Sequence, residues 1–357
     1  IYFQYEAPAF SFLANVAAVP LATCAFTLAF LLIFLPYTVF HEAISWMIQG
    51  VLWISRQSYG MLTIGHVPFL WVLLFYFMTG LWIWKKNGQN RHIRISLAYV
   101  IMIILIWIPM ARRKSLAFLD VGQGDCFVAD TKSGAIIFDG GSSSEDQVGR
   151  YRILPYMKYL GYQKIQIAVI SHMDIDHYSG IKELLEMGKI KYLGLPEIPK
   201  DATMKKIIGI AKKRGTTIFY LSRGRQITTK DGSLKVLHPQ KNSQMEKNAA
   251  SLVMQGKILG YRVLLTGDVE KEGEEELLSE ELERADILKA AHHGSKNSTS
   301  NEFLQKVQPK QTVISCGKQN RYGHPHLETI HRLQTYRTKI YRTDRSGAII
   351  FFKRRDG

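Results

Sequence analysis

Four side chains that can bind a metal ion follow one another closely in the segment VISHMDIDHYSG, residues 169–180. They are His172, Asp174, Asp176 and His177. An apolar run, Ile165–Ile170, precedes them and predicts a buried strand, and a helical pattern follows from Gly180. Imidazole and carboxylate groups at the carboxyl end of such a strand are typical of a metal site in an α/β protein.

The spacing of these four residues favours two neighbouring ions over one. In an extended segment, side chains at every second position share a face. We therefore expect His172, Asp174 and Asp176 to converge, and His177 to turn to the other side. The alternative is a solvated polar loop that only caps the following helix.

Two later segments carry further candidate residues, each at the end of an apolar run. Tyr261–Leu265 predicts a buried strand that leads through Thr-Gly to Asp268, and Ala285–Ala291 predicts a strand that ends in His292 and His293. Adjacent side chains on a strand point to opposite faces. One histidine can therefore bind metal while the other faces a substrate.

Basic residues near these histidines are candidates for contacts with a phosphate. Lys296 and the hydroxyls of residues 298–300 stand at the start of a predicted helix, where an anion is favoured. Ordinary capping of that helix is the alternative. Arg321 and His324, in the loop NRYGHPH, are candidates for phosphate contact and for protonation of a leaving group.

Three other polar residues stand at predicted strand ends. Asp139 precedes two glycines, which favours a role in a turn, whereas Asp125 in VGQGD is left open between a turn and the site. His238 stands alone after a strand. A structural role is favoured for His238, although its position also suits a further histidine ligand.

The composition indicates an anionic partner. The chain has 357 residues and a formal net charge of +16, a balance that suits nucleic acid or membrane lipid. Its three scattered cysteines predict no disulfide framework. Because the chain begins with Ile1 rather than Met, we expect it to be a fragment or a processed piece.

The first 114 residues differ in character from the rest. Three apolar runs, Phe12–Phe40, Val67–Trp84 and Ile93–Met110, each approach the ~20 residues that cross a bilayer core. They predict a multi-pass protein of the cell membrane, with residues 42–65 lying amphipathically at the interface. Basic residues between positions 85 and 94 outnumber those at 112–114, which favours an extracytoplasmic location for the soluble part.

The segment HxDxDH resembles the HxHxDH signature of the metallo-β-lactamase superfamily, with Asp174 in place of the second histidine. The added carboxylate makes the site more anionic and favours manganese or magnesium alongside zinc. In that superfamily a carboxylate after Thr-Gly at a strand end bridges two metals. The resemblance assigns this role to Asp268, and its spacing to the HHGS segment favours His293 over His292 as a ligand.

The complete set of motifs resembles the ComEC family, the DNA channel proteins of natural competence. DVGQGD, SHxDxDH, LLTGD, HHGS and YGHP follow the apolar runs in order. The resemblance implies an α-helical membrane segment, residues 1–114, at the end of the channel domain. It implies an α/β metallo-β-lactamase-like αββα sandwich in residues 115–357. The expected partners are DNA, the lipid membrane and other competence uptake proteins.

The family implies uptake of one DNA strand, while the sandwich degrades the other with two divalent ions, Mn²⁺ or Zn²⁺. We expect His172 and Asp174 to hold one ion and Asp176, His177 and His293 to hold the other, with Asp268 as the bridge between them. We expect His292 or His324 to protonate the leaving oxygen. Lys296 and Arg321 are expected to contact phosphates. Two alternatives stay open. One is a membrane-anchored hydrolase of small phosphodiesters, and the other is a DNA-binding channel module that does not cut.

Overall fold

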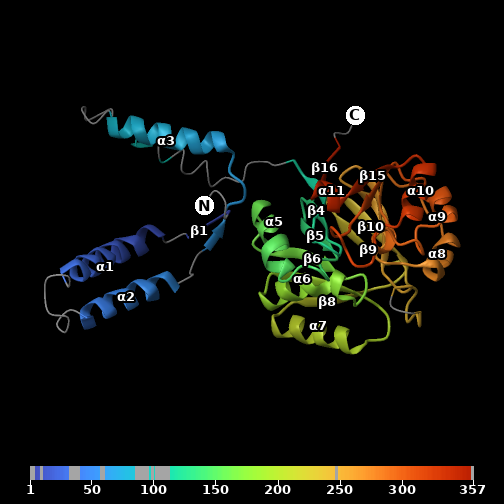
Figure 1. The fold of residues 1–357 in the computed structure, drawn as a ribbon, viewed down its shortest axis with the longest axis horizontal. Coiled ribbons are helices and arrows are strands. Elements are labelled where there is room, and N and C mark those ends of the chain that lie inside the picture. The colour runs from blue at the N-terminus through green and yellow to red at the C-terminus, as the bar shows by residue number, and fades with distance from the viewer. Residues whose placement is uncertain are drawn as a thin grey trace. The chain divides into compact units, whose positions relative to one another are not determined.

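The computed structural model describes residues 5–8, 11–31, 41–56, 61–84, 96–97, 100, 113–245 and 248–354 (Figure 1). The chain divides into two compact units, Ile1–Met110 and Ala111–Gly357.

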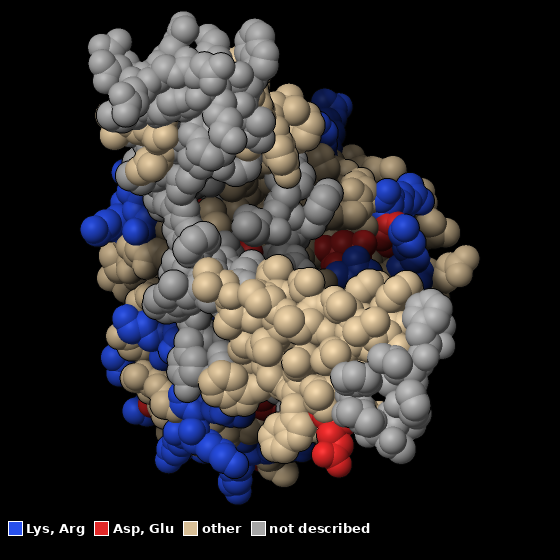
Figure 2. All heavy atoms as spheres, turned by 90° about the vertical axis from the view of Figure 1, so that its left-hand side faces the viewer, with Lys and Arg blue, Asp and Glu red and all other residues tan. Residues whose placement is uncertain are grey.

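The first unit is built mainly from apolar helices. Its described elements are β1 (Glu6–Pro8), α1 (Ser11–Leu31), α2 (His41–Arg56), β2 (Met61–Thr63) and α3 (Phe69–Trp84). β1 pairs with β2 in an antiparallel ladder, and α1 packs against α2. Neither α1 nor α3 contains an acidic or basic residue. Figure 2 shows a broad area in which the described side chains are uncharged.

Within the part of the chain that the structure describes, no helix combines the length and apolar character needed to cross a bilayer. The predicted membrane-spanning segment therefore has no support there. Its third run, residues 93–110, and the basic residues at positions 85–94 lie almost wholly outside the described residues. The membrane location and its orientation stay predictions.

The second unit is a four-layer sandwich, which confirms the predicted αββα fold. One sheet has the strand order β16-β3-β4-β5-β6-β7-β8, and the other has the order β15-β14-β13-β12-β11-β10-β9. The first sheet comprises β3 (Ser115–Phe118), β4 (Phe127–Thr131), β5 (Gly134–Phe138), β6 (Ile165–Val169), β7 (Ile190–Pro196), β8 (Thr217–Leu221) and β16 (Ile349–Phe352). The second comprises β9 (Gln226–Thr229), β10 (Gly232–His238), β11 (Val253–Ile258), β12 (Tyr261–Leu265), β13 (Ile287–Lys289), β14 (Gln311–Ile314) and β15 (Lys339–Arg342).

Helices cover the outer face of each sheet (Figure 1). The first sheet carries η1 (Gly149–Ile153), α5 (Leu154–Tyr159), α6 (Ile175–Glu186) and α7 (Ala202–Lys213). The second carries η2 (Ala291–Gly294), α8 (Lys271–Leu278), α9 (Asn301–Val307), α10 (Leu327–Thr335) and the short α11 (Thr343–Ser346). β13 ends two residues before the predicted strand does.

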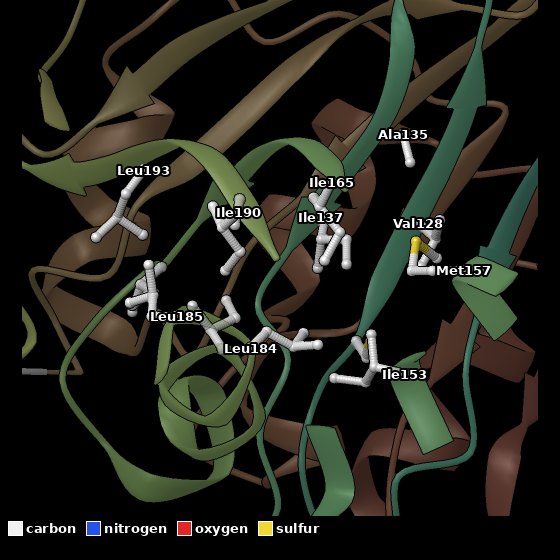
Figure 3. Close-up of a cluster of buried hydrophobic side chains, with 14 of the residues drawn as sticks. Val128, Ala135, Ile137, Ile153, Met157, Ile165, Leu184, Leu185, Ile190 and Leu193 are labelled. Atoms are coloured by element: carbon white, nitrogen blue, oxygen red, sulfur yellow. The ribbon is translucent and has the colours of Figure 1, made fainter. Parts of the chain in front are cut away.

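Three apolar layers hold the sandwich together. In the outer layer of the first half, Ile137 and Ile165 from the sheet meet Leu184 from α6 (Figure 3). A second layer lies between the sheets, and a third lies between the second sheet and α8, α9 and α10. Burial on both faces explains why the central strands read as continuous apolar runs in the sequence. These layers fix the carboxyl ends of β6, β12 and β13, from which the candidate site extends.

Candidate metal centre

The loop that carries the first four candidate ligands is shorter than the sequence predicts. α6 begins at Ile175, with Asp174 as its extended N-cap residue, so Asp176 and His177 lie in the first helical turn. In a helix successive side chains rotate by about 100° rather than alternate between two faces. The prediction that His177 turns away is therefore wrong. Its imidazole is fully buried, and its Nε2 lies 3.1 Å from Oδ2 of Asp268.

A buried carboxylate fixes the orientation of the His177 ring. Oδ2 of Asp139 lies 2.9 Å from Nδ1 of His177, and Oδ1 of Asp139 accepts the backbone N–H of Ser171. Such a partner selects the tautomer in which Nε2 of a histidine is available to a metal. The expectation of a simple turn role for Asp139 is therefore wrong. Its position before Gly140 and Gly141 concealed it, because glycines after an aspartate are also the mark of a turn.

The second half of the sandwich brings Asp268 and His293 to the same point. Nε2 of His293 lies 3.4 Å from Oδ2 of Asp268 and 3.4 Å from Oδ2 of Asp176. Nδ1 of His293 lies 3.0 Å from the carbonyl oxygen of Ser315, which orients the ring. The site is thus shared by β6–α6 of one half and by the ends of β12 and β13 of the other.

His292 and His293 do not lie on a strand, as the sequence predicts. Strand β13 ends at Lys289, and both histidines occupy the tight turn η2 with φ of 46° and 53°. This left-handed backbone is uncommon outside glycine and is concentrated at functional sites. It separates the ring centroids by 6.1 Å at an interplanar angle of 70°. The Nδ1 of His292 contacts Oε1 of Glu270 at 2.8 Å, and its Nε2 lies 3.9 Å from Oδ2 of Asp268.

Four side chains have ligand atoms within 4.8 Å of one another, and all four are buried. They are Asp125, His177, Asp268 and His293. The remaining predicted ligands adjoin this group. The His172 ring centroid lies 4.1 Å from that of His177, and Nε2 of His172 lies 3.6 Å from Oδ2 of Asp174. Asp176 also belongs to this set, which then has seven members. We call these seven residues the floor of the site: Asp125, His172, Asp174, Asp176, His177, Asp268 and His293.

The floor fits divalent metal ions by the state of its donor atoms. Within the described residues, several of these buried atoms have no hydrogen-bond partner of acceptable geometry. They are the Nε2 atoms of His172, His177 and His293, Oδ1 of Asp268 and Oδ1 of Asp125, whereas Oδ2 of Asp125 pairs with Lys289. Buried polar atoms are almost always paired, so a converging set without partners indicates an ion-binding site. A mixed imidazole and carboxylate set suits zinc and manganese.

Lys289 lies beside this floor, and its only mark in the sequence is that of a lysine near the end of an apolar run. Its Nζ contacts Oδ2 of Asp125, donates to the carbonyl of Gly267 at 3.1 Å, and lies 3.6 Å from Oδ1 of Asp268. Burial lowers the pKa of the Lys289 ammonium, but Asp125 and Asp268 outweigh it and hold that pKa above its usual value. Lys289 is therefore a permanent cation beside the floor.

A cavity of ≈ 320 Å³ opens above the floor. Its lining residues are Gln123, Ser143, Asp174, Ile175, Asp176, Asn248, Asp268, His292, His293, Tyr322 and His324. Burial and the imidazoles of His293 and His292 lower the pKa of His324 to about 4. We call the exposed residues Arg321 and Tyr322, together with His324, the rim. The Nη2 of Arg321 donates to the Tyr322 hydroxyl at 2.7 Å.

At the start of α9, where the sequence predicts contacts with a phosphate, the backbone N–H groups already donate to side chains of the protein. Ser300 caps the helix by accepting the backbone N–H of Phe303 at 3.2 Å. Glu274 accepts the N–H groups of Thr299 and Ser300. The N–H of Lys296 donates to Nδ1 of His326 at 3.2 Å, and Lys296 is not among the described residues that line the cavity. The capping alternative describes this segment.

His238 lies in a different environment from the histidines of the floor. Its Nε2 lies 2.7 Å from the carbonyl oxygen of Ala249, and its Nδ1 lies 2.8 Å from Oε2 of Glu276. These contacts join β10 to α8. They support the structural role that was favoured for this residue.

Comparisons with known proteins agree with this architecture. The sequence model of the Metallo-beta-lactamase superfamily matches residues 119–318, more than half of the chain. "ComE operon protein 3" of Bacillus subtilis is 33% identical over 294 residues, which cover 76% of this chain and 38% of that protein. "Competence protein ComA" of Neisseria gonorrhoeae is 31% identical over 245 residues, covering 67% of this chain and 32% of that protein.

A third relative, "Recombination protein 2" of Haemophilus influenzae, is 27% identical over 268 residues, covering 74% of this chain and 32% of that protein. The chain thus spans about a third of the length of the curated relatives it matches. The match extends from the end of β3 past β14 and includes the segments that build the floor. The chain belongs to the metallo-beta-lactamase superfamily, because the matched region contains the whole floor and the fold has two stacked sheets between helical layers.

Proposed function

We propose that the chain is a phosphodiesterase that uses divalent metal ions to cleave DNA, and that it acts in DNA uptake. The observation that carries this proposal is the convergence of buried donor atoms without hydrogen-bond partners from His177, Asp268 and His293. Leaving such atoms buried is costly unless a cation pairs with them. Asp268 and His293 line the cavity, so a cation bound between them is accessible to a substrate.

The proposal assigns two ions to the floor. Asp176, His177 and His293 would hold one, with Asp268 between the two halves of the sandwich as the bridge. His172 and Asp174, whose facing atoms are 3.6 Å apart, would hold the second. When bound, Mn²⁺ or Zn²⁺ lowers the pKa of water towards ~7 and stabilises the charge that develops on a phosphate.

His292 is placed to give a proton to the leaving oxygen. Its Nδ1 lies 2.8 Å from Oε1 of Glu270, which fixes the orientation of the ring. Its other nitrogen, Nε2, faces the cavity 3.9 Å from Oδ2 of Asp268. A proton held at Nε2 is therefore within reach of a substrate bound at Asp268. His324, the other candidate for this step, has a pKa of about 4, so near neutral pH it does not carry the proton that a general acid needs.

DNA as the substrate is supported by charge and by relatives. A net charge of +16 favours polyanions, and Arg321 lies at the rim beside the cavity. One relative carries the word competence in its name and another the word recombination. The proposal also places the chain in the cell membrane, with the sandwich on the extracytoplasmic side and other competence proteins as partners. The uncharged sequences of α1 and α3 are compatible with contact to lipid, but neither helix has the length and apolar character needed to cross a bilayer.

The size of the cavity favours a second candidate, a hydrolase of small phosphodiesters. A volume of ≈ 320 Å³ is at the lower end of pockets that bury a drug-sized ligand. Such a pocket holds one small unit rather than a duplex.

One assay separates these functions. The 357-residue chain is loaded with Mn²⁺ or Zn²⁺ and offered single-stranded DNA, duplex DNA and bis(4-nitrophenyl) phosphate. Degradation of DNA that is lost in Asp176→Ala supports the proposed function. Cleavage of the small ester alone supports the second candidate. Binding of metal and DNA without turnover of any substrate contradicts both and supports a DNA-binding module.

The matched control is Asp286→Asn. Asp286 is a buried aspartate of the second half, and it pairs with Lys310 and Arg354 rather than with the floor. Its replacement is expected to leave turnover intact. If this variant loses activity as fully as Asp176→Ala does, the loss reports general unfolding and the assignment of the floor fails.

A further inference from the structure

We propose that Tyr322 forms a subsite for a nucleobase at the rim of the cavity, where it takes the base of an unpaired nucleotide whose phosphate reaches the floor. The inference rests on the proposed function and defines its substrate as an unpaired strand. Tyr322 lines the cavity yet is 43% exposed. An exposed aromatic ring beside a phosphate-binding floor is the arrangement by which proteins bind single-stranded nucleic acid.

The aromatic rings form a continuous path from the floor to the rim. Tyr322 stacks on His324, with ring centroids 5.7 Å apart and an interplanar angle of 21°. The His324 ring lies 6.1 Å from that of His293 and 5.4 Å from that of His292. A base that stacks on Tyr322 is therefore connected through one intervening ring to the residues that surround the reacting phosphate.

A flat cation already occupies the place proposed for the base. The Arg321 guanidinium lies over the Tyr322 ring, with Cζ 4.9 Å from the centroid. Guanidinium groups and bases both stack on aromatic faces, and an exposed cation–π contact is the weaker of the two. A base can therefore displace the guanidinium. Arg321 is then released to pair with the neighbouring phosphate.

The loop holds the Tyr322 ring in position before any ligand binds. The Asn320 amide donates to the carbonyl oxygens of Gly317 and His324 at 2.9 and 2.6 Å. Oδ1 of Asn320 accepts the backbone N–H groups of Tyr322 and His324 at 3.2 and 3.0 Å. Gly323 supplies the positive φ of 71° that this tight loop requires. A preformed loop lowers the entropic cost of ordering on binding.

A second apolar side chain lies at the same cavity. Ile175, the first residue of α6, is 54% exposed and precedes Asp176. Exposed apolar groups over a polar floor match a nucleotide, which has an apolar base and an anionic phosphate. The ≈ 320 Å³ volume accommodates roughly one such unit, so the nucleotide must be unpaired.

The charge around the cavity indicates the path of the nucleic-acid strand over the surface. A larger cleft of ≈ 790 Å³ borders the cavity at Asp174 and Asn248, and its further lining includes Glu270, Glu272 and Glu275 against one basic residue, Lys271. These carboxylates repel phosphates. Tyr322 is not among the described residues of that cleft. The strand therefore runs over the rim and not through the acidic cleft.

The test compares a single-stranded oligonucleotide with the same strand carrying a run of abasic residues, on the full chain with Mn²⁺. The measured quantity is the ratio of kcat/KM for the two strands. Tyr322→Leu is expected to lower this preference for bases by about 5- to 150-fold, the range for loss of one stacked base. Tyr322→Phe keeps the ring and is expected to retain the preference. Tyr151→Leu, which removes a 64% exposed tyrosine on η1, is the matched control and keeps it too.

Two outcomes overturn the subsite. In one, Tyr322→Leu lowers kcat/KM equally on both strands, as a structural role requires. In the other, the variant leaves the preference for bases unchanged. If the wild-type chain cleaves neither strand, the proposed function fails. The subsite is still decided by the ratio of Kd values for the two strands with Ca²⁺ in place of Mn²⁺, which must show the same dependence on Tyr322.

Discussion

The floor and the rim of the cavity differ in how their side chains are held. His177, His293 and Asp268 are at most 3% exposed and contact one another across the two halves of the sandwich. Tyr322 is 43% exposed and is held by a single loop around Asn320. Buried charged groups depend on one another, whereas exposed ones act nearly independently. Changes in the floor should therefore alter metal binding, stability and turnover together. Changes in the rim should alter only which substrate is bound and how tightly.

The largest effect is expected from Asp268→Asn. Asp268 contacts both His177 and His293, so its loss removes the bridge between the two halves of the floor. We expect turnover to fall by at least ~10³-fold, because the ions that are proposed to activate water would no longer be held. Turnover and metal content per chain are measured on the same sample. Normal metal content with normal turnover contradicts the role of Asp268 as the bridge.

Lys289→Met tests whether the floor depends on its internal cation. Removal of the ammonium leaves Asp125 and Asp268 buried without their cationic partner, which costs about 3–5 kcal/mol of stability. Urea denaturation measures this cost. Saturating Mn²⁺ should recover part of it, because an ion binds the folded floor only. Lys310→Met is the control: its side chain is 63% exposed, and its pair with Asp286 contributes ~0–1 kcal/mol. Equal effects for the two lysines would contradict the account.

A smaller effect is expected from Asp139→Asn, which leaves every proposed ligand in place. Asp139 orients His177 through Nδ1, and loss of such a partner typically weakens metal affinity by about 10- to 100-fold. Isothermal titration with Zn²⁺ measures this change. Asp130→Asn is the matched control, since Asp130 is equally buried but pairs with Lys114 and Tyr162. Unchanged affinity in Asp139→Asn would show that the His177 ring needs no such support.

The smallest effect is expected at the rim, from Arg321→Gln. One lost phosphate contact should weaken DNA binding uniformly and reduce the slope of log K against log salt by about 1. Metal affinity should stay the same, since Arg321 contacts Tyr322 and not the floor. Fluorescence anisotropy at several salt concentrations gives the slope. Lys212→Gln, at the exposed end of α7, is the control and should not change it. A change in metal affinity in Arg321→Gln would break the distinction between floor and rim.

Residues that follow long apolar strands were the ones that the sequence could locate. β6 and β12 are buried on both faces, so their ends, and with them His172 and Asp268, were predictable from apolar runs alone. The αββα fold followed from the resemblance, not from the apolar runs. Periodicity could not give the start of α6, because the one-turn difference that buries His177 depends on tertiary packing.

The residues that the sequence missed are those defined by contacts between distant segments. Lys289 and Asp125 meet only when β13 of one half faces the loop after β3 of the other. Asp139 read as a turn residue because its partner His177 is far along the chain. The turn at His292 and His293 was read as a strand, since a left-handed backbone at two non-glycine residues leaves no mark in an apolar pattern.

The central claim, that the floor binds divalent ions, is tested most directly by anomalous X-ray diffraction from crystals of the chain loaded with Mn²⁺. The account predicts an anomalous peak within coordination distance of Asp268, His177 and His293, which disappears in Asp268→Asn. The claim is contradicted if a loaded crystal shows no anomalous peak between these side chains and they contact only one another and Lys289.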